Sequence, residues 1–168
     1  MAGALQAAGL LVWRRRGDQV QVLLAHPGGP LFARKDAGHW TVPKGEVGDG
    51  EDPLTAARRE FAEEIGTAAP TGPAVPLGQA RQKSGKVNTV WAVEGDVDVT
   101  AVVSNEFTME WPPRSRRMQS FPEVDRAVWF DLDGEARVRI RTAQVVFLDR
   151  LRARIQGAPD PVQPTLDP

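Results

Sequence analysis

Three glutamates, Glu60, Glu63 and Glu64, gather within five consecutive positions of the chain. On a helix, residues three and four apart are neighbours, so these carboxylates would share one face and repel one another by roughly a few tenths of a kcal/mol per pair. A cation among them would remove that cost. Mg²⁺ suits such a cluster because it is a hard ion that takes oxygen ligands while keeping waters and substrate phosphates. The spacing therefore predicts a metal site; the alternative is a solvated acidic helix face.

A helix between Asp52 and Gly66 is expected to position these glutamates. Asp52 offers a side-chain acceptor at the N-cap, and Pro53 suits the first helical position. Gly66 is a natural stop, because glycine takes the left-handed conformation without strain. An apolar stripe at spacings of three and four faces a core. Its members are Leu54, Ala57, Phe61 and Ile65.

The surrounding residues follow a longer fixed pattern, G-x5-E-x7-R-E-φ-x-E-E-x-G, from Gly45 to Gly66. This pattern resembles the Nudix box of pyrophosphohydrolases that cut nucleoside diphosphates linked to another group. One position departs from it, since Thr67 stands where the family usually has an aliphatic residue. The resemblance implies an α/β fold, the Nudix α/β/α sandwich, with a central mixed sheet and the box as a loop and helix.

The resemblance also implies roles for the acidic residues. Glu60 and Glu64 are expected as inner ligands of Mg²⁺, for which Mn²⁺ is a substitute, and Glu63 as a third, catalytic carboxylate that shares a second ion. A main-chain carbonyl near Lys44 or Gly45 would complete the shell. The metal would neutralise diphosphate oxygens and activate a water for in-line attack at phosphorus.

A late carboxylate is expected to orient or deprotonate that water. Glu123 precedes Trp129 by six residues, a spacing similar to that of a catalytic glutamate in diadenosine tetraphosphate hydrolases. Its rival is Glu106, whose distance after the box also suits such a role. Either residue read alone is an ordinary surface carboxylate.

Four further box residues are expected to be structural. Arg59 and Glu51 can form a bidentate bond that holds the loop on the helix. Gly45 and Gly66 belong to the same framework, one in the loop and one at the helix stop.

The segment before the box narrows the resemblance. His39 to Gly45 contains W-x-x-P-K-G, which looks like the corresponding segment of diadenosine tetraphosphate hydrolases and of diphosphoinositol polyphosphate phosphohydrolases. The stretch from Lys83 to Trp91 is similar to the K-x-x-K-x-x-x-x-W strand of the tetraphosphate enzymes. Lys44, Lys83 and Lys86 are therefore expected to contact phosphates, with plain solvated lysines as the alternative. Because the chain has no tyrosine, a Trp, a Phe or His39 would have to stack a base.

The segment from Glu94 to Glu123 departs from the compact tetraphosphate enzymes. It is longer and carries a basic stretch, Trp111 to Arg117. Two interpretations stay open: the insertion overhangs the site and reads a base or phosphate, or it is a solvated basic loop with Trp111 against the sheet.

The remaining elements are predicted from local patterns. Strands are expected at 7–13, 19–25, 87–93 and 127–130, a short extended stretch at 40–43, a linker at 68–76 and a helix from about Thr142. At 168 residues the chain fits one domain, 1–156, and the proline-containing segment 157–168 is expected to be a disordered tail.

Composition excludes several functions. The net charge of −1 gives no general polyanion-binding surface, and the absence of cysteine removes thiol chemistry and disulfides. No secretory signal or membrane span is visible, so a cytoplasmic location is expected. No DNA-reading segment is apparent. The chain is expected as a monomer or homodimer.

The predicted function is Mg²⁺-dependent hydrolysis of a pyrophosphate bond in a nucleotide polyphosphate. A dinucleoside tetraphosphate, giving a nucleoside triphosphate and a monophosphate, is the leading substrate. The alternatives are an intact or oxidised nucleoside triphosphate and the 5′ end of an RNA. A non-catalytic, nucleotide-binding regulator is the rival class; such modules usually lose a box carboxylate, whereas all three are present here.

Overall fold

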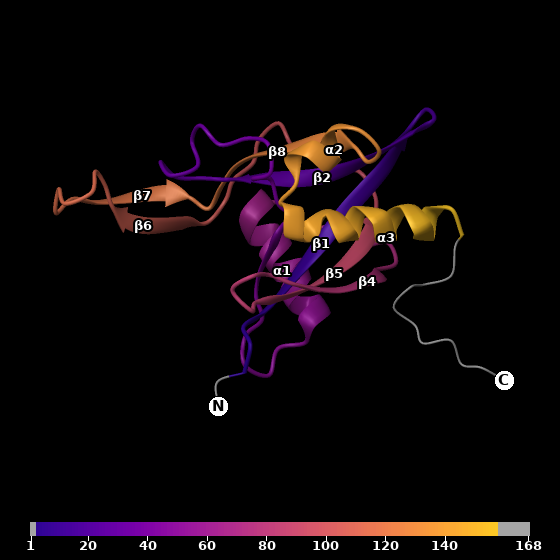
Figure 1. The fold of residues 1–168 in the computed structure, drawn as a ribbon, viewed down its shortest axis with the longest axis horizontal. Coiled ribbons are helices and arrows are strands. Elements are labelled where there is room, and N and C mark those ends of the chain that lie inside the picture. The colour runs from indigo at the N-terminus through magenta and orange to yellow at the C-terminus, as the bar shows by residue number, and fades with distance from the viewer. Residues whose placement is uncertain (1–2, 158–168) are drawn as a thin grey trace.

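A six-stranded sheet organises the computed structural model, which describes residues 3–157 (Figure 1). Its strands are β1 (Gln6–Arg16), β2 (Gln19–Pro27), β3 (Lys44–Glu46), β4 (Val75–Arg81), β5 (Val87–Glu94) and β8 (Val124–Asp131). They lie in the order β4-β5-β1-β2-β8, and β3 pairs with β1 off this path. β1 is parallel to β5, whereas the other paired strands are antiparallel. The sheet is therefore mixed, as predicted.

Helices cover both faces of this sheet. Along β1, Leu10 packs with Phe61 of α1 (Pro53–Ile65), whereas the next residue, Leu11, packs with Phe147 of α3 (Val145–Ile155) on the other side. This alternation follows from the period of two along a strand. The predicted α/β/α sandwich is confirmed, with α1 and its glutamates in one layer.

The ends of α1 form as the sequence predicts. The side chain of Asp52 accepts a hydrogen bond from the main-chain amide of Thr55 at 3.0 Å. Gly66 ends the helix with φ of +86°, a conformation that is strained for residues with a side chain. Phe61 and Ile65 are fully buried, which fixes the rotation of the helix and turns the glutamates away from the core.

A separate hairpin of β6 (Glu106–Glu110) and β7 (Met118–Pro122) projects from the body of the molecule (Figure 1). The basic stretch Trp111 to Arg117 forms its tip, where the amide of Trp111 donates to the carbonyl of Arg117 at 2.9 Å. The arginines of this stretch are exposed, as one interpretation expected, but the tip lies at the far end of the hairpin and not against the main sheet. The tip also lies well away from α1 in this view, so it does not overhang the glutamates.

Several elements differ from the expectations. The linker predicted at 68–76 is too long, because β4 already begins at Val75, and α2 (Glu135–Arg139) was not foreseen. The stretch 40–43 is held by isolated bridges of Thr41 to Ala25 and of Trp40 to Ile140. The late helix starts as a 3-10 turn, Thr142–Gln144, and continues as α3.

The predicted tail lies outside the described residues, apart from Gly157. Across residues 3–157, none of the helices has the length and apolar character needed to cross a bilayer.

Candidate active site

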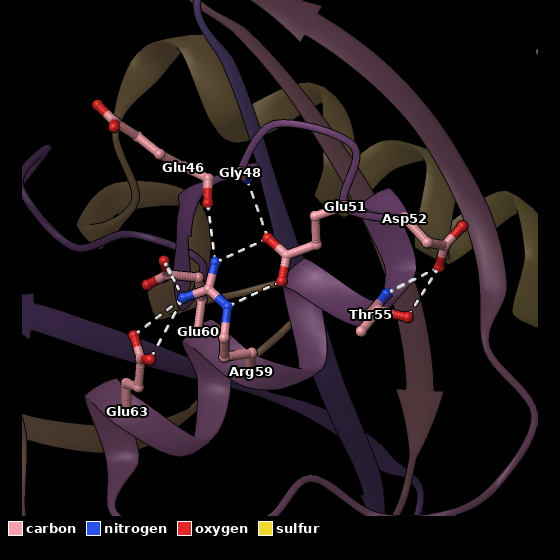
Figure 2. A network of polar contacts seen from close by, with 8 residues as sticks. All are labelled: Glu46, Gly48, Glu51, Asp52, Thr55, Arg59, Glu60 and Glu63. Atoms are coloured by element: carbon pink, nitrogen blue, oxygen red, sulfur yellow. Dashed lines mark hydrogen bonds and ion pairs between the residues drawn. The ribbon is translucent and has the colours of Figure 1, made fainter.

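Arg59 is the centre of a polar network on α1 (Figure 2). Its Nε and Nη2 donate to the two carboxylate oxygens of Glu51 at 2.9 Å each, and Nη2 also donates to the carbonyl of Glu46 at 3.0 Å. Glu51 in turn accepts from the amide of Gly48 at 3.0 Å. These bonds fasten the box loop to the helix, and they hold the pKa of Glu51 at about 2, well below its ordinary value, chiefly through Arg59.

The same guanidinium reaches the acidic face of the helix. Its Nη1 donates to Glu60 at 2.9 Å and to Glu63 at 3.2 Å. Bonds to Glu51 first, then to Glu60, raise the pKa of Arg59, so it stays charged throughout the ordinary pH range. Arg59 therefore partly neutralises the glutamates from one side while locking the loop on the other.

Glu60 and Glu64 lie against the main chain of β3. A Cβ atom at Gly45 would lie 2.0 Å from the carboxyl carbon of Glu60, so a side chain there would push this carboxylate out of its place. Glu64 accepts a hydrogen bond from the amide of Lys44 at 3.2 Å. Both carboxylates thus lie next to the Lys44–Gly45 backbone, where the resemblance implies a metal-binding carbonyl.

The electrostatics of these carboxylates favour a bound cation. Burial, and then the charge of Glu60, raise the pKa of Glu64 to about 8. Burial also raises the pKa of Glu60, against the lowering effect of Arg59. Partly desolvated carboxylates that repel one another are stabilised when a nearby cation replaces the lost solvation.

The donor set fits a hard divalent ion held openly rather than in a closed cage. Among residues 3–157, no three Asp, Glu or His side chains are placed so that they alone could hold a metal ion. The groups present are oxygen donors, the carboxylates of Glu60, Glu63 and Glu64 beside the Lys44–Gly45 backbone. Such a set suits Mg²⁺, which keeps several waters and takes substrate phosphates as further ligands.

Glu123 approaches the cluster from the hairpin side. Its charge raises the pKa values of Glu60 and Glu64, and its own pKa is raised by burial and by Glu63. Glu106 pairs across the hairpin with Pro122, the residue before Glu123. Glu106 is exposed at the start of β6, whereas Glu123 lies in the bend between β7 and β8.

Basic residues lie on the other side of the glutamates. Lys44 is partly buried, and burial followed by the charge of Lys86 lowers its pKa to about 8. Arg141 acts on Lys44 in the same direction. Lys83, in contrast, is exposed in the turn between β4 and β5. The structure thus brings Lys44 and Lys86 together and leaves Lys83 outside the group.

Two residues beside these cations were missed from the sequence. The Arg141 guanidinium lies 6.0 Å from the ring centre of Phe32, and that ring lies 6.5 Å from the ring of His39. Phe32 belongs to the loop after β2, and Arg141 precedes the 3-10 turn. No spacing relates either residue to the box, so a single sequence carried no signal for them.

The sandwich and its glutamate-bearing loop and helix define the class of this protein. A model of the NUDIX domain family matches residues 4–151, and the chain belongs to that family. The expected family is therefore confirmed. Proteins of this family generally use divalent metal ions.

Named relatives agree with this assignment. The asymmetrical bis(5′-nucleosyl)-tetraphosphatase of Caenorhabditis elegans is 42% identical over 60 residues, which cover 36% of this chain and 39% of that protein. The rat (Rattus norvegicus) protein of the same name is 34% identical over 115 residues, or 61% of this chain and 74% of that protein. The chain thus spans well under half of the worm relative.

A solved structure extends the likeness to the whole fold. A C. elegans Ap4A hydrolase in a binary complex has a TM-score of 0.63 and 22% identity, covering 90% of this chain and 98% of that chain. At this identity the likeness shows the fold.

Proposed function

We propose that the chain is a Mg²⁺-dependent Nudix pyrophosphohydrolase of nucleotide polyphosphates, with a dinucleoside tetraphosphate as its leading substrate. The observation that carries this proposal is that an acidic group and a basic group of side chains lie next to the same segment of backbone. The carboxylates Glu60 and Glu64 lie on one side of the Lys44–Gly45 backbone, and a group of cations lies beside it. A polyphosphate chain needs both, a divalent metal at the reacting phosphorus and cations along the rest.

The residues then divide the work as follows. Glu60 and Glu64 would hold the ion, and Glu63 would help to hold a second one. When bound, Mg²⁺ neutralises the diphosphate oxygens and lowers the pKa of a coordinated water. Glu123 would orient the attacking water or take its proton. As the new O–P bond forms, the bond from the same phosphorus to its bridging oxygen breaks, and the bridging oxygen leaves on the product phosphate.

The cations Lys44, Lys86 and Arg141 would set the direction in which the polyphosphate chain runs through the site. Lys44 and Lys86 would contact the phosphates beyond the cleaved bond by charge-assisted hydrogen bonds. Arg141 continues from Lys44 toward Phe32 and His39, whose rings offer apolar faces for a base. In a chain without tyrosine, this loop supplies the aromatic surface that a nucleotide requires.

The named tetraphosphatase relatives support the same substrate class. A nucleoside triphosphate, oxidised or not, or an RNA 5′ end would use the same metal and fewer or differently placed cations. A non-catalytic regulator is disfavoured, because Glu60, Glu63 and Glu64 are all retained and lie beside the Lys44–Gly45 backbone and Arg59.

A substrate panel tests the proposal. The purified chain is incubated with Mg²⁺ and diadenosine tetraphosphate, ATP, 8-oxo-dGTP, a 5′-triphosphorylated RNA or ADP-ribose, and the products are separated by chromatography. We expect the highest kcat/KM for the tetraphosphate, with ATP and AMP as products. A higher value for another member of the panel reassigns the substrate. Turnover of none of them, with or without Mn²⁺, overturns the enzymatic assignment.

A further inference from the structure

His26 is a fully buried polar residue that the proposed chemistry does not use. Its Nδ1 lies 2.8 Å from Oδ1 of Asp125, and its Nε2 lies 2.6 Å from the carbonyl oxygen of Lys35. Both partners are hydrogen-bond acceptors, so both contacts are satisfied only when each ring nitrogen carries a proton. The ring also packs edge-on against Trp40, with 5.1 Å between ring centres. His26 is thus held from several sides.

Asp125, its partner, is the extra residue of a β-bulge. Between β2 and β8, His26 pairs with Arg126 and the following Pro27 pairs with Val124, which leaves Asp125 unpaired in the ladder. A bulge bends its strand and redirects nearby side chains, and bulges are common beside active sites. The bond from His26 to Asp125 therefore fixes an irregularity that lies two residues after Glu123.

The backbone of Glu123, just before this bulge, is fastened through both its carbonyl and its amide. Its carbonyl accepts from the amide of Gly28 at 2.9 Å, and its amide donates to Asn105 at 2.8 Å. The amide of Asn105 in turn donates to the carbonyl of Glu63 at 2.9 Å, which ties this segment to the end of α1. A Cβ at Gly28 would lie 2.0 Å from the carbonyl oxygen of Pro122, so the loop after β2 approaches as closely as glycine allows.

We propose that His26 and Asp125 are positioning residues for Glu123. The buried ring fixes the bulge through Asp125, and the bulge sets the direction in which the Glu123 carboxylate faces the glutamates of α1. Through Lys35 the same ring holds the loop that carries Phe32 and His39. This inference rests on the proposed function, in which Glu123 handles the attacking water.

If His26 and Asp125 had only a structural role, their loss would lower the stability of the protein to the same extent whether or not Glu123 is present. A positioning pair acts through Glu123, so its effect on turnover must depend on that carboxylate being present. The two roles therefore separate in a double-mutant cycle, because residues that act as a unit give strongly non-additive effects.

The cycle uses Asp125→Ala in the wild-type protein and in Glu123→Gln, with kcat and KM measured for the substrate that the panel selects. Alone, Asp125→Ala is expected to lower kcat by about tenfold, since misplacing a reacting group by about 1 Å costs up to about a hundredfold. KM should stay within about twofold, because substrate contacts are retained. In Glu123→Gln, the same substitution should change kcat by less than about twofold. Asp131→Ala, on the same strand but beyond the bulge, is the matched control and should leave kcat unchanged.

The outcomes separate the inference from the function on which it rests. If Glu123→Gln alone leaves kcat unchanged, the proposed role of Glu123 is wrong. If Glu123→Gln is slow but Asp125→Ala costs the same factor in both backgrounds, the positioning role is overturned and the catalytic one stands. Thermal unfolding checks that the variants fold. If Asp125→Ala does not fold, Asp125→Asn replaces it in the same cycle, because the amide keeps one acceptor oxygen for the ring. Its loss of kcat should be smaller and should again depend on the presence of Glu123.

Discussion

The main-chain amide of Lys44 donates a hydrogen bond to the carboxylate of Glu64 across the junction of β3 and α1. This bond makes the position of Glu64, a proposed metal ligand, depend on the strand in which the box begins. The Lys44 ammonium and the Glu64 carboxylate are both largely desolvated, and burial lowers the pKa of the first and raises the pKa of the second to about 8 in each case. A cation at Glu64 would relieve the carboxylate without disturbing the strand.

Glu64→Gln is therefore expected to keep the fold and lose turnover. The amide is nearly isosteric and still accepts from Lys44, but it removes one anionic metal ligand. We expect kcat to fall by at least about a hundredfold, beyond the usual effect of residues that only orient ligands. Raising the Mg²⁺ concentration should recover part of the loss, since the ion is exchangeable. Glu46→Gln is the matched control, because its side chain points away from the network in Figure 2. Wild-type kcat for Glu64→Gln at low Mg²⁺ would show the ligand assignment to be wrong.

The two late glutamates should behave differently. Glu123→Gln is expected to lower kcat by at least about tenfold, within the usual range for general-base catalysis. Glu106→Gln should be nearly silent, because Glu106 is exposed at the start of β6, whereas Glu123 is the late carboxylate whose charge acts on Glu60 and Glu64. Steady-state kinetics of both variants decide the matter. The reverse result would move the base to β6 and remove the basis for the positioning role of His26.

The box could be predicted from the sequence because its interactions are local. The cap at Asp52, the stop at Gly66 and the bidentate pair of Arg59 with Glu51 all join residues within one loop and one helix. Spacing along the chain then translates directly into position in space. Elements elsewhere gave weaker signals: β4 contains Pro76, which an edge strand tolerates, and α2 has five residues, too few for a helical period.

The remainder of the site depends on contacts that spacing does not encode. His26 and Asp125 are 99 positions apart, and they meet only because β2 pairs with β8 across a bulge. Arg141 reaches Phe32 and the neighbourhood of Lys44 only after the late part of the chain has folded back on the loop after β2. Such meetings are set by the sheet order, which no local pattern in one sequence specifies.

The bond between Arg59 and Glu51 makes the stability of the protein depend on pH. In the folded protein the pKa of Glu51 is about 2, whereas its ordinary value is 4.5. A lowered folded pKa means that the pair stabilises the protein fully above about pH 4.5 and loses this contribution as the pH falls toward about 2. The free energy of unfolding of wild type should therefore exceed that of Glu51→Gln at neutral pH, and the difference should shrink between about pH 5 and about pH 2.

Urea titrations across this pH range measure the difference in the free energy of unfolding. Asp49→Asn, an exposed carboxylate in the same loop, is the control. A difference that stays constant with pH would mean that the charge of Glu51 contributes nothing.

Lys86 and Lys83 form a matched pair for testing the phosphate side. Lys86 lies close enough to Lys44 to lower its pKa, whereas Lys83 is exposed in the preceding turn. Lys86→Ala should therefore raise KM for diadenosine tetraphosphate by about tenfold, about 1.4 kcal/mol, which is close to the lower end of the range for hydrogen bonds to charged groups. Its kcat should be nearly unchanged, because the contact is equally strong in the ground and transition states.

The ratio of kcat/KM for the tetraphosphate to kcat/KM for ADP-ribose should fall in Lys86→Ala, since the shorter substrate has fewer phosphates to lose contact with. Lys83→Ala should alter neither parameter by more than about twofold. If the two substitutions have equal effects, or if the substrate preference is unchanged in Lys86→Ala, Lys86 does not contact the phosphates. The proposed metal site would then still stand, but the structural argument for a long polyphosphate substrate would not.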